Sequence, residues 1–385
     1  MTASMSRVIT TMFATCVLAA CASAPAPPPP KHVDATNQIL GGRAEGTPKE
    51  LRKKGEEALL AQRWQDAVDA FEALVAGDPA SASDPQIVYD LAVAYEGIGD
   101  REKARARYRE VVRRFPQDAN ARSALAREVS LDAYLEDWKA LGDAGEQILA
   151  RPDIEPADRM LGLGARGLAR ITAGDDAKAS RDVNDGLDLA EQTHFGETGQ
   201  LPVAVAMLKY AQGEVRKARS EKITLNPPPP DFVLKLEMRC QLLLDAQSSY
   251  ADAIRSVDLQ WAAMSGYRVG EMYQQLHVHL MQIPPVAKAK TESDKQLFYG
   301  IMHVRYRALL EKGIEMMKRT LGLGERTGVG SAWMKRAETA KEEMEKSLEA
   351  EKTMLKTFPY SEETLEKTLE IMKKKQADEA AKATK

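Results

Sequence analysis

The chain has 385 residues, 44% of them hydrophobic and 29% charged, a balance that excludes both a disordered chain and a membrane-embedded one. Its length suits one or two domains, each with its own core. A formal net charge of −3 at pH 7 gives no basic excess of the kind that nucleic-acid binding requires.

The N-terminus carries the pattern of a secretion signal. The apolar run Val8–Ala20 follows Arg7; it is too short to span a bilayer but suits the apolar core of a signal peptide. The run ends in Leu18-Ala19-Ala20-Cys21, which resembles the lipobox of bacterial lipoproteins. The alternative is an ordinary small-x-small cleavage site at Ala20-Cys21-Ala22. We expect residues 1–20 to be a lipoprotein signal peptide.

The lipobox resemblance implies that Cys21 is a membrane anchor. Cleavage before Cys21 would leave its thiol and its amine to be acylated with palmitate or a similar chain. Several acyl chains on one residue hold a protein stably, since each buried CH₂ contributes about 0.8 kcal/mol. In lipoproteins of two-membrane bacteria, a residue other than Asp at the next position implies the outer membrane, and here it is Ala22. We expect a periplasm-facing outer-membrane lipoprotein.

Residues 21–46 read as a tether. Ala22–Pro30 is rich in Ala and Pro and favours polyproline II, which would reach about 28 Å at about 3.1 Å per residue. Once Cys16 leaves with the signal and Cys21 is acylated, Cys240 is the one cysteine left, so no intrachain disulfide can form. The helical pattern around Cys240 predicts a buried, unreactive side chain.

The folded part begins with a helix start signal. In Thr47-Pro48-Lys49-Glu50, Thr caps, Pro occupies the first helical position and Glu completes a capping box. The helical pattern that follows breaks at Gln62-Arg63 into two amphipathic halves. The second half carries Trp64, Ala67 and Phe71 and stops before Pro79. This predicts a helical hairpin starting at about residue 48.

The same order of residues recurs 37 positions later. Ala104 repeats Ala67, and Pro116 repeats Pro79. A small residue, Tyr, Ala, an aromatic residue and Pro at these offsets resemble the 34-residue tetratricopeptide repeat. The resemblance implies an all-α fold in which antiparallel helix pairs stack into a superhelix, an α-solenoid. Small side chains let paired helices approach closely, and Phe71 and Tyr108 fill the gap toward the next pair.

The rest of the chain matches this repeat pattern less well. Tetratricopeptide-like repeats are expected over 47–224, with a fifth hairpin at 201–224, and a proline break at 225–230. Longer helical patterns over 231–360 read as divergent helical repeats, interrupted around 283–296. Residues 361–385 begin as a helix and end as a charged tail that we expect to be partly disordered. No strand-length alternation of apolar and polar residues occurs, so a sheet is not expected.

Three patterns suggest chemistry, and each has a simpler explanation. Gly162–Gly167 matches GxGxxG, but no strand precedes it and Gly167 fits a repeat helix. Met281–Pro284 and Glu292-Ser293 resemble pieces of the lytic transglycosylase signature, in reversed order and without the burial that a general acid needs. His277 and His279 point to different faces of a helix and cannot share a metal. We therefore predict no catalytic residue, no cofactor and no metal site.

The tetratricopeptide resemblance implies a binding face instead. In this family the side chains of the first helix of each pair line a concave face that meets an extended peptide or a partner helix. Ordinary solvated helix residues are the alternative for each position. The carboxylate-clamp variant of the family has Asn where Glu56 stands here, which argues against that variant. The candidate residues are Lys49, Arg52, Glu56, Gln86, Tyr89, Val93 and Glu96.

These patterns together predict a lipid-anchored scaffold or adaptor of an envelope complex, not an enzyme. Its partners would be envelope proteins, with the membrane reached through acylated Cys21, and neither nucleic acid nor a small-molecule substrate is expected. The long C-terminal helical part loosely resembles tetratricopeptide lipoproteins of gliding-motility envelope complexes. The alternative is a peptidoglycan-acting enzyme, or a regulator of peptidoglycan synthesis or of outer-membrane assembly.

Overall fold

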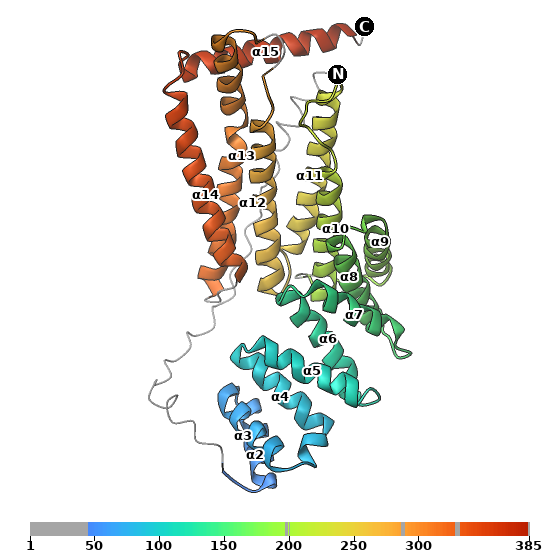
Figure 1. Cartoon of the computed structure of the whole chain (residues 1–385). Coiled ribbons are helices and arrows are strands. Elements are labelled where there is room, and N and C mark those ends of the chain that lie inside the picture. The colour runs from blue at the N-terminus through green and yellow to red at the C-terminus, as the bar shows by residue number, and fades with distance from the viewer. Residues whose placement is uncertain (1–44, 197–198, 200, 286–288, 328–331, 384–385) are drawn as a thin grey trace. The chain divides into compact units, whose positions relative to one another are not determined.

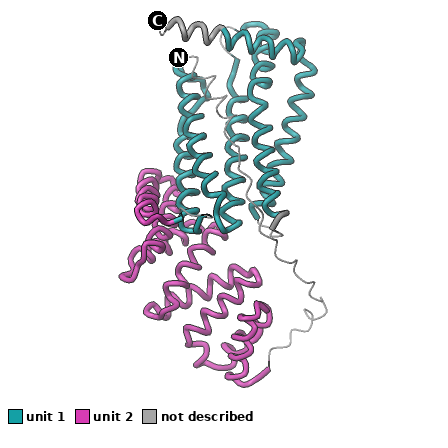
Figure 2. The backbone as a smooth tube through the Cα atoms, turned by 180° about the vertical axis from the view of Figure 1, so that it is seen from behind, with its two compact units in different colours: residues 1–28, 196–385 teal, residues 29–195 magenta. Residues whose placement is uncertain are grey.

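The computed structural model describes residues 45–196, 199, 201–285, 289–327 and 332–383 (Figure 1). The expected signal peptide, Cys21 and nearly all of the tether lie outside these residues. The described chain is all-α, a helical repeat solenoid with no strand; its one β-bridge pairs Leu201 with Ser256. None of the described helices combines the length and the apolar content that crossing a membrane requires. The chain forms two compact units, divided at 195/196 (Figure 2).

Unit 2, described over 45–195, consists of four helix pairs. Within each pair, and from each pair to the next, consecutive helices pack together, and the first helices of neighbouring pairs also touch. A short 3₁₀ helix, η2 (Ser81–Ser83), joins the first two pairs. The pairs are α2 (Pro48–Leu60) with α3 (Trp64–Gly77), α4 (Pro85–Ile98) with α5 (Arg101–Arg114), α6 (Ala119–Tyr134) with α7 (Trp138–Ala150), and α8 (Pro156–Thr172) with α9 (Asp176–Gln192).

Local sequence signals place these helix ends. The capping box at the start of α2 is confirmed: the Glu50 amide donates to Thr47 Oγ1, and the Thr47 amide donates to Glu50 Oε2 at 2.8 Å. The predicted break at Gln62-Arg63 is the turn between α2 and α3, where Gln62 adopts φ 54°. Helices α3 and α5 each end two residues before the expected proline.

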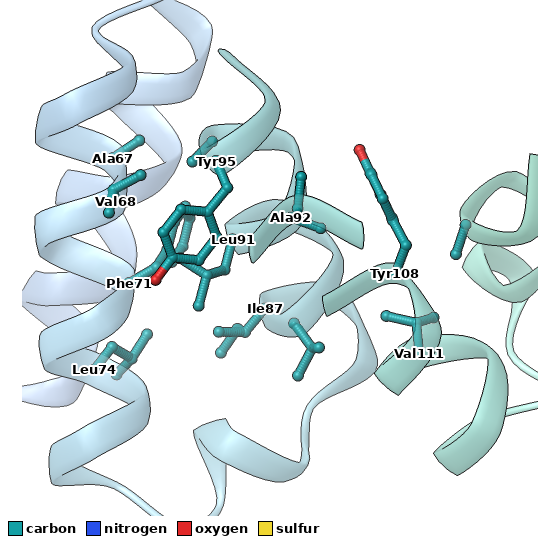
Figure 3. Packing of buried hydrophobic residues seen from close by; sticks show 14 of the residues in the cluster. Ala67, Val68, Phe71, Leu74, Ile87, Leu91, Ala92, Tyr95, Tyr108 and Val111 are labelled. Atoms are coloured by element: carbon teal, nitrogen blue, oxygen red, sulfur yellow. The ribbon is translucent and has the colours of Figure 1, made fainter. Parts of the chain in front are cut away.

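Small residues at the helix crossings allow the close packing that the repeats predict. A Cβ built on Gly55 of α2 would lie 2.7 Å from the Phe71 ring of α3. Ala67, Ala92 and Ala104 are fully buried at the corresponding places. The aromatic rings of Phe71 and Tyr108, also fully buried, occupy the space between neighbouring pairs (Figure 3). The first two helix pairs and α6 therefore share one continuous core.

Unit 1, described from residue 196 onward, is built from longer helices. They lie side by side along most of their length, α12 against α13 and α13 against α14 (Figure 1). The expected interruption around 283–296 overlaps the connection between α12 and α13, but residues 292–296 already belong to α13. The helices are α10 (Val203–Glu221), α11 (Phe232–Ala253), α12 (Leu259–Met281), α13 (Glu292–Thr327), α14 (Ala332–Leu355) and α15 (Glu362–Ala383).

The predicted hairpin at 201–224 is wrong. These residues form one helix, α10, whose partner is α11. The Tyr250 ring of α11 lies against Gly213 of α10, and its hydroxyl donates to Glu214 at 2.8 Å. The proline run 227–230 is thus the turn inside a helix pair and not a break between domains. The division of the chain falls at 195/196, before α10, because α10 packs into unit 1.

The C-terminal segment also differs from the expectation of a partly disordered tail. Residues Glu362–Ala383 form α15, and Leu365 and Leu369 near its start are buried. Leu365 packs against Gly300 of α13, and Glu362 forms an ion pair with Arg307. A short apolar stripe among charged residues is enough to hold this helix on α13.

We predict that Gly55→Ala lowers the free energy of unfolding by about 1–2 kcal/mol. The added methyl group overpacks the crossing against Phe71, and the gain in helix propensity offsets only part of that cost. Gly77→Ala is the matched control, because a Cβ there meets nothing within 4 Å, and we expect it to be neutral or slightly stabilising. Urea unfolding followed by circular dichroism measures both. Equal effects of the two changes would contradict a tight crossing at Gly55.

Candidate functional site: the first-helix face of unit 2

The seven candidate residues lie on one side of two neighbouring helices. On α4, Gln86, Tyr89, Val93 and Glu96 follow the i, i+3, i+7, i+10 spacing of one helix face, opposite the buried Leu91. The same spacing joins Lys49, Arg52 and Glu56 on α2. Helices α2, α4 and α6 touch in sequence, so their outward sides form one surface. We call this surface the first-helix face.

The first link across this face joins α2 to α4. The Arg52 guanidinium donates to Glu56 Oε1 at 2.9 Å within α2 and to Asp84 Oδ2 at 3.0 Å. Asp84 is the N-cap of α4, so it also accepts from the Gln86 amide at 2.9 Å. One arginine therefore holds a carboxylate of its own helix and the cap of the next one.

The second link joins α4 to α6. The Asn120 side-chain amide of α6 donates to Gln86 Oε1 at 3.1 Å, and Gln86 Nε2 donates to Asp90 Oδ1 at 2.8 Å. Asp90 is half-buried, and that burial raises the pKa of its carboxyl to about 6, against the lowering effect of the Gln86 hydrogen bond. The Asp90 carboxyl, in the middle of the face, therefore loses its proton at a higher pH than an exposed aspartate does.

The third link joins α4 to α5 and α6, next to the aromatic residues of the face. The half-buried Tyr89 ring meets the Tyr108 ring edge-on, with 5.4 Å between centroids. The Tyr108 hydroxyl donates to Glu96 Oε2 at 2.9 Å, and Arg127 Nη1 of α6 donates to Glu96 Oε1 at 3.3 Å. Glu96 thus ties an interior tyrosine to an exposed arginine. Beside this pair, Tyr89 and Val93 offer apolar area at the surface.

Three further residues of this face, Asp90, Asn120 and Arg127, are not among the candidates predicted from the sequence. Asp90 stands four residues after Gln86, and helix spacing alone places both on one face. Asn120 lies 34 residues after Gln86, the length of one tetratricopeptide repeat, so the repeat period would have found it. Arg127 likewise lies 34 residues after Val93. The sequence of the third pair departs too far from the repeat pattern to reveal these relations by itself.

The other patterns of the sequence fall elsewhere. Gly162–Gly167 lies inside α8, with its three glycines buried, so it is no phosphate loop. Glu292, the first residue of α13, is exposed and forms an ion pair with Lys295 at 3.3 Å, without the apolar burial that acid catalysis needs. Among the residues that the structure describes, no group of three or more His, Cys, Asp or Glu could hold a metal ion.

The two histidines of α12 have different partners. His277 is buried, with Nε2 2.8 Å from Glu351 Oε1, and His303 of α13 lies 3.3 Å from the same oxygen. Although burial raises it, the two imidazoles lower the pKa of Glu351 to about 2. His279 Nδ1 lies 2.6 Å from Arg239 Nη2 instead. These contacts join α11 with α12, and α12 and α13 with α14, inside unit 1.

Sequence comparison identifies the repeats of unit 2. Residues 58–128 match the tetratricopeptide repeat family. This range contains α3, α4 and α5 and flanking parts of α2 and α6, so it includes α4 and parts of the two other helices of the first-helix face. This part of the chain therefore carries tetratricopeptide repeats. No curated protein matches the chain by sequence.

Several solved structures are similar to the chain. A tetratricopeptide repeat protein from Parabacteroides merdae has 14% identity and a TM-score of 0.38, covering 77% of this chain and 98% of its own. A TPR repeats protein from Bacteroides fragilis has 10% identity and a TM-score of 0.28, covering 79% and 100%. The human IFIT1 dimer with m7Gppp-AAAA has 14% identity and a TM-score of 0.35, covering 80% and 72%.

We predict that Asp90→Asn stabilises the protein at pH 7 by about 1–2 kcal/mol. Because the folded-state pKa is raised to about 6, the contribution of Asp90 to stability is fully present below about pH 4 and is lost as the pH rises through 6. The advantage of the variant should therefore shrink from pH 7 to pH 4. Urea unfolding at several pH values measures it.

Asp69→Asn is the matched control for this prediction. Asp69 accepts from Gln65 at 2.9 Å in the same i, i+4 arrangement, but it is exposed on α3. We expect its substitution to change stability little at any pH between 4 and 7. A pH-independent effect of Asp90→Asn, or the same pH profile for both variants, would contradict the raised pKa.

Proposed function

We propose that this protein is a lipid-anchored, periplasm-facing scaffold that binds protein partners on the first-helix face of unit 2. The observation that carries the proposal is the set of links between α2, α4 and α6, which fix side chains of three successive helices as one surface. Tetratricopeptide repeats generally bind proteins by surface complementarity. A surface that is ordered before binding loses less conformational entropy when a partner docks.

The chemistry of the face favours an extended peptide segment of a partner that carries both apolar and charged side chains. Tyr89 and Val93 offer an apolar patch where a partner's apolar side chain can rest. Arg127, whose side chain is 57% exposed, can receive a carboxylate, and Lys49 is exposed at the other end of the face. Asp90 can accept from a donor of the partner. We infer that apolar contacts set the affinity and that the charged ends set the orientation.

The proposed anchor explains how such a face would be presented. Acylated Cys21 would hold the chain at the outer membrane, and residues 22–46 would carry unit 2 away from the bilayer on a polyproline and flexible tether. The partners would then be envelope proteins within reach of that tether. The narrower proposal is a multiprotein envelope machine of the gliding-motility kind, suggested by the resemblance of the C-terminal helices.

We predict that the native protein fractionates with the outer membrane and that Cys21→Ala is lost from that fraction, because the variant lacks the residue that would be acylated. Affinity purification from gently solubilised envelopes, with mass spectrometry, should recover a defined set of envelope proteins that the variant loses. Recovery of glycan fragments without proteins, or outer-membrane attachment that persists in Cys21→Ala, would contradict the proposal.

We predict that Val93→Arg removes those partners, whereas Val112→Arg keeps them. Both valines are partly buried against the same core, but Val93 is on the first-helix face and Val112 is on α5. The two changes carry the same charge and bulk, so differences in stability should be small while differences in partner recovery should be large. Equal recovery by the two variants would place the binding surface elsewhere.

A further inference from the structure

Exposed apolar side chains gather at one end of unit 1. Ten large hydrophobic residues of the described chain are exposed, and seven of them lie on the four helices that meet at this end. Single exposed apolar residues are ordinary, but a concentration of them in one place points to an interaction surface. We call this region the apolar end. Its exposed residues are Val233, Leu234, Met238, Val278, Tyr299, Ile371 and Met372.

The apolar end is formed by turns that are far apart in the sequence. Asn226, in the turn between α10 and α11, donates from Nδ2 to the Gln282 carbonyl oxygen just after α12, at 3.3 Å. The Ser293 hydroxyl at the start of α13 lies 2.6 Å from the Tyr360 hydroxyl just before α15. Helix α15 lies across this end (Figure 1). The tertiary structure therefore brings α11, α12, α13 and α15 together here.

Helix α15 presents one side to solvent at the apolar end. Ile371 stands two residues after the buried Leu369, on the opposite side of the helix, and is 66% exposed. Lys367 stands four residues before Ile371 and Lys374 three residues after it, so the three share that side. Lys367 also pairs with Glu363 of α15 at 2.6 Å, with both side chains more than 70% exposed. An exposed pair of this kind holds the ammonium group only weakly.

This chemistry suits the surface of a lipid bilayer. An apolar side chain between lysines can enter the boundary of the acyl chains while the ammonium groups stay among the headgroups. Val233 and Leu234 add two exposed apolar side chains at the start of α11, directly after the proline turn. These side chains stand near the ends of separate helices, so a flat surface can meet them together.

We propose that the apolar end of unit 1 rests on the surface of an anionic phospholipid bilayer. Apolar side chains of α11 and α15 enter the interface, and Lys367 and Lys374 meet anionic headgroups. The inference rests on the proposed Cys21 anchor for the presence of a bilayer within reach. A contact of this size is reversible and does not replace several acyl chains, so Cys21→Ala should still be lost from the outer-membrane fraction.

The test measures co-sedimentation of the protein with large unilamellar vesicles. The chain used carries Cys21→Ala and lacks residues 1–20, because acyl chains or the apolar run Val8–Ala20 would bind vesicles by themselves. Phosphatidylcholine vesicles with about one quarter phosphatidylglycerol should bind it saturably at millimolar lipid. The affinity for pure phosphatidylcholine vesicles should be at least about fivefold lower, because the lysines lose their anionic headgroups.

Two variants should separate the apolar from the electrostatic contribution. Ile371→Ser with Met372→Ser should weaken binding to both kinds of vesicle at least about tenfold, because less apolar area enters the interface. Lys367→Gln with Lys374→Gln should bring the two kinds of vesicle to equal affinity, because the attraction to phosphatidylglycerol is removed.

Matched controls make the same changes away from the apolar end. Leu60→Ser with Val257→Ser removes two other exposed apolar side chains. Lys335→Gln with Lys346→Gln removes two exposed charges of α14. Both controls should bind vesicles as the parent chain does.

Three outcomes would overturn the proposal: no saturable binding to either kind of vesicle, unchanged binding after Ile371→Ser with Met372→Ser, and equal losses in the matched controls. If that variant unfolds, Val233→Ser with Leu234→Ser tests the same end from α11 and should also weaken binding. Dimers in sedimentation velocity that the serine variant loses, without vesicle binding, would show instead that this end joins two copies of the chain. The assay contains no partner protein and no acyl chain, so its failure leaves the proposed scaffold function untouched.

Discussion

The structure of unit 2 depends on the close approach of paired helices at positions without a bulky side chain. Where α2 crosses α3, the absence of a Cβ on Gly55 admits the Phe71 ring into the space that a side chain would fill. That ring then contributes to the core shared with the next pair, so a single small residue couples packing within a pair to packing between pairs.

Buried carboxylates held by arginines add a directional constraint to this apolar packing. Asp132 of α6 has no exposed surface, and its Oδ1 accepts from Arg105 at 3.2 Å and Arg109 at 2.9 Å, both on α5. Burial nonetheless raises the pKa of Asp132 to about 6, because the two guanidiniums compensate its desolvation only in part. Such a cluster costs desolvation and fixes register, since any shift would leave a buried charge unpaired.

Asp182 repeats this arrangement between α9 and α8. Its carboxylate accepts from Arg166 at 2.8 Å and from Arg170 at 2.6 Å. In unit 1, Arg268 of α12 lies between Glu214 of α10 and Glu271, at 2.9 and 2.8 Å. Each unit thus combines interchangeable apolar contacts with a few charged contacts that specify one arrangement. A rigid arrangement is what the first-helix face requires, because its side chains come from three different helices.

The first-helix face follows from how unit 2 packs its helices. The helices of this unit are short and regularly paired, and the outward sides of the first helices form a polar and aromatic face. In unit 1 the longer helices α11, α12 and α13 leave only a small apolar cavity among them.

The sequence by itself determined the elements that depend on near neighbours. The capping box at Thr47, the turn at Gln62, the prolines after α3 and α5, and the 37-residue recurrence of small and aromatic residues act over one or two helical turns or one repeat. They were enough to predict the all-α fold, the first helix pairs and the side of α2 and α4 on which the candidate residues lie.

Only the tertiary structure decided which distant elements meet. In it α10 pairs with α11 through the contact of Tyr250 with Gly213, and α15 packs on α13 through Leu365. The division of the chain falls at 195/196. The tertiary structure also set the burial of Asp90. These features depend on contacts between residues far apart in the chain, and no local sequence pattern encodes the free energies of such contacts. Local patterns therefore determine where the helices form, whereas tertiary packing determines which helices contact one another.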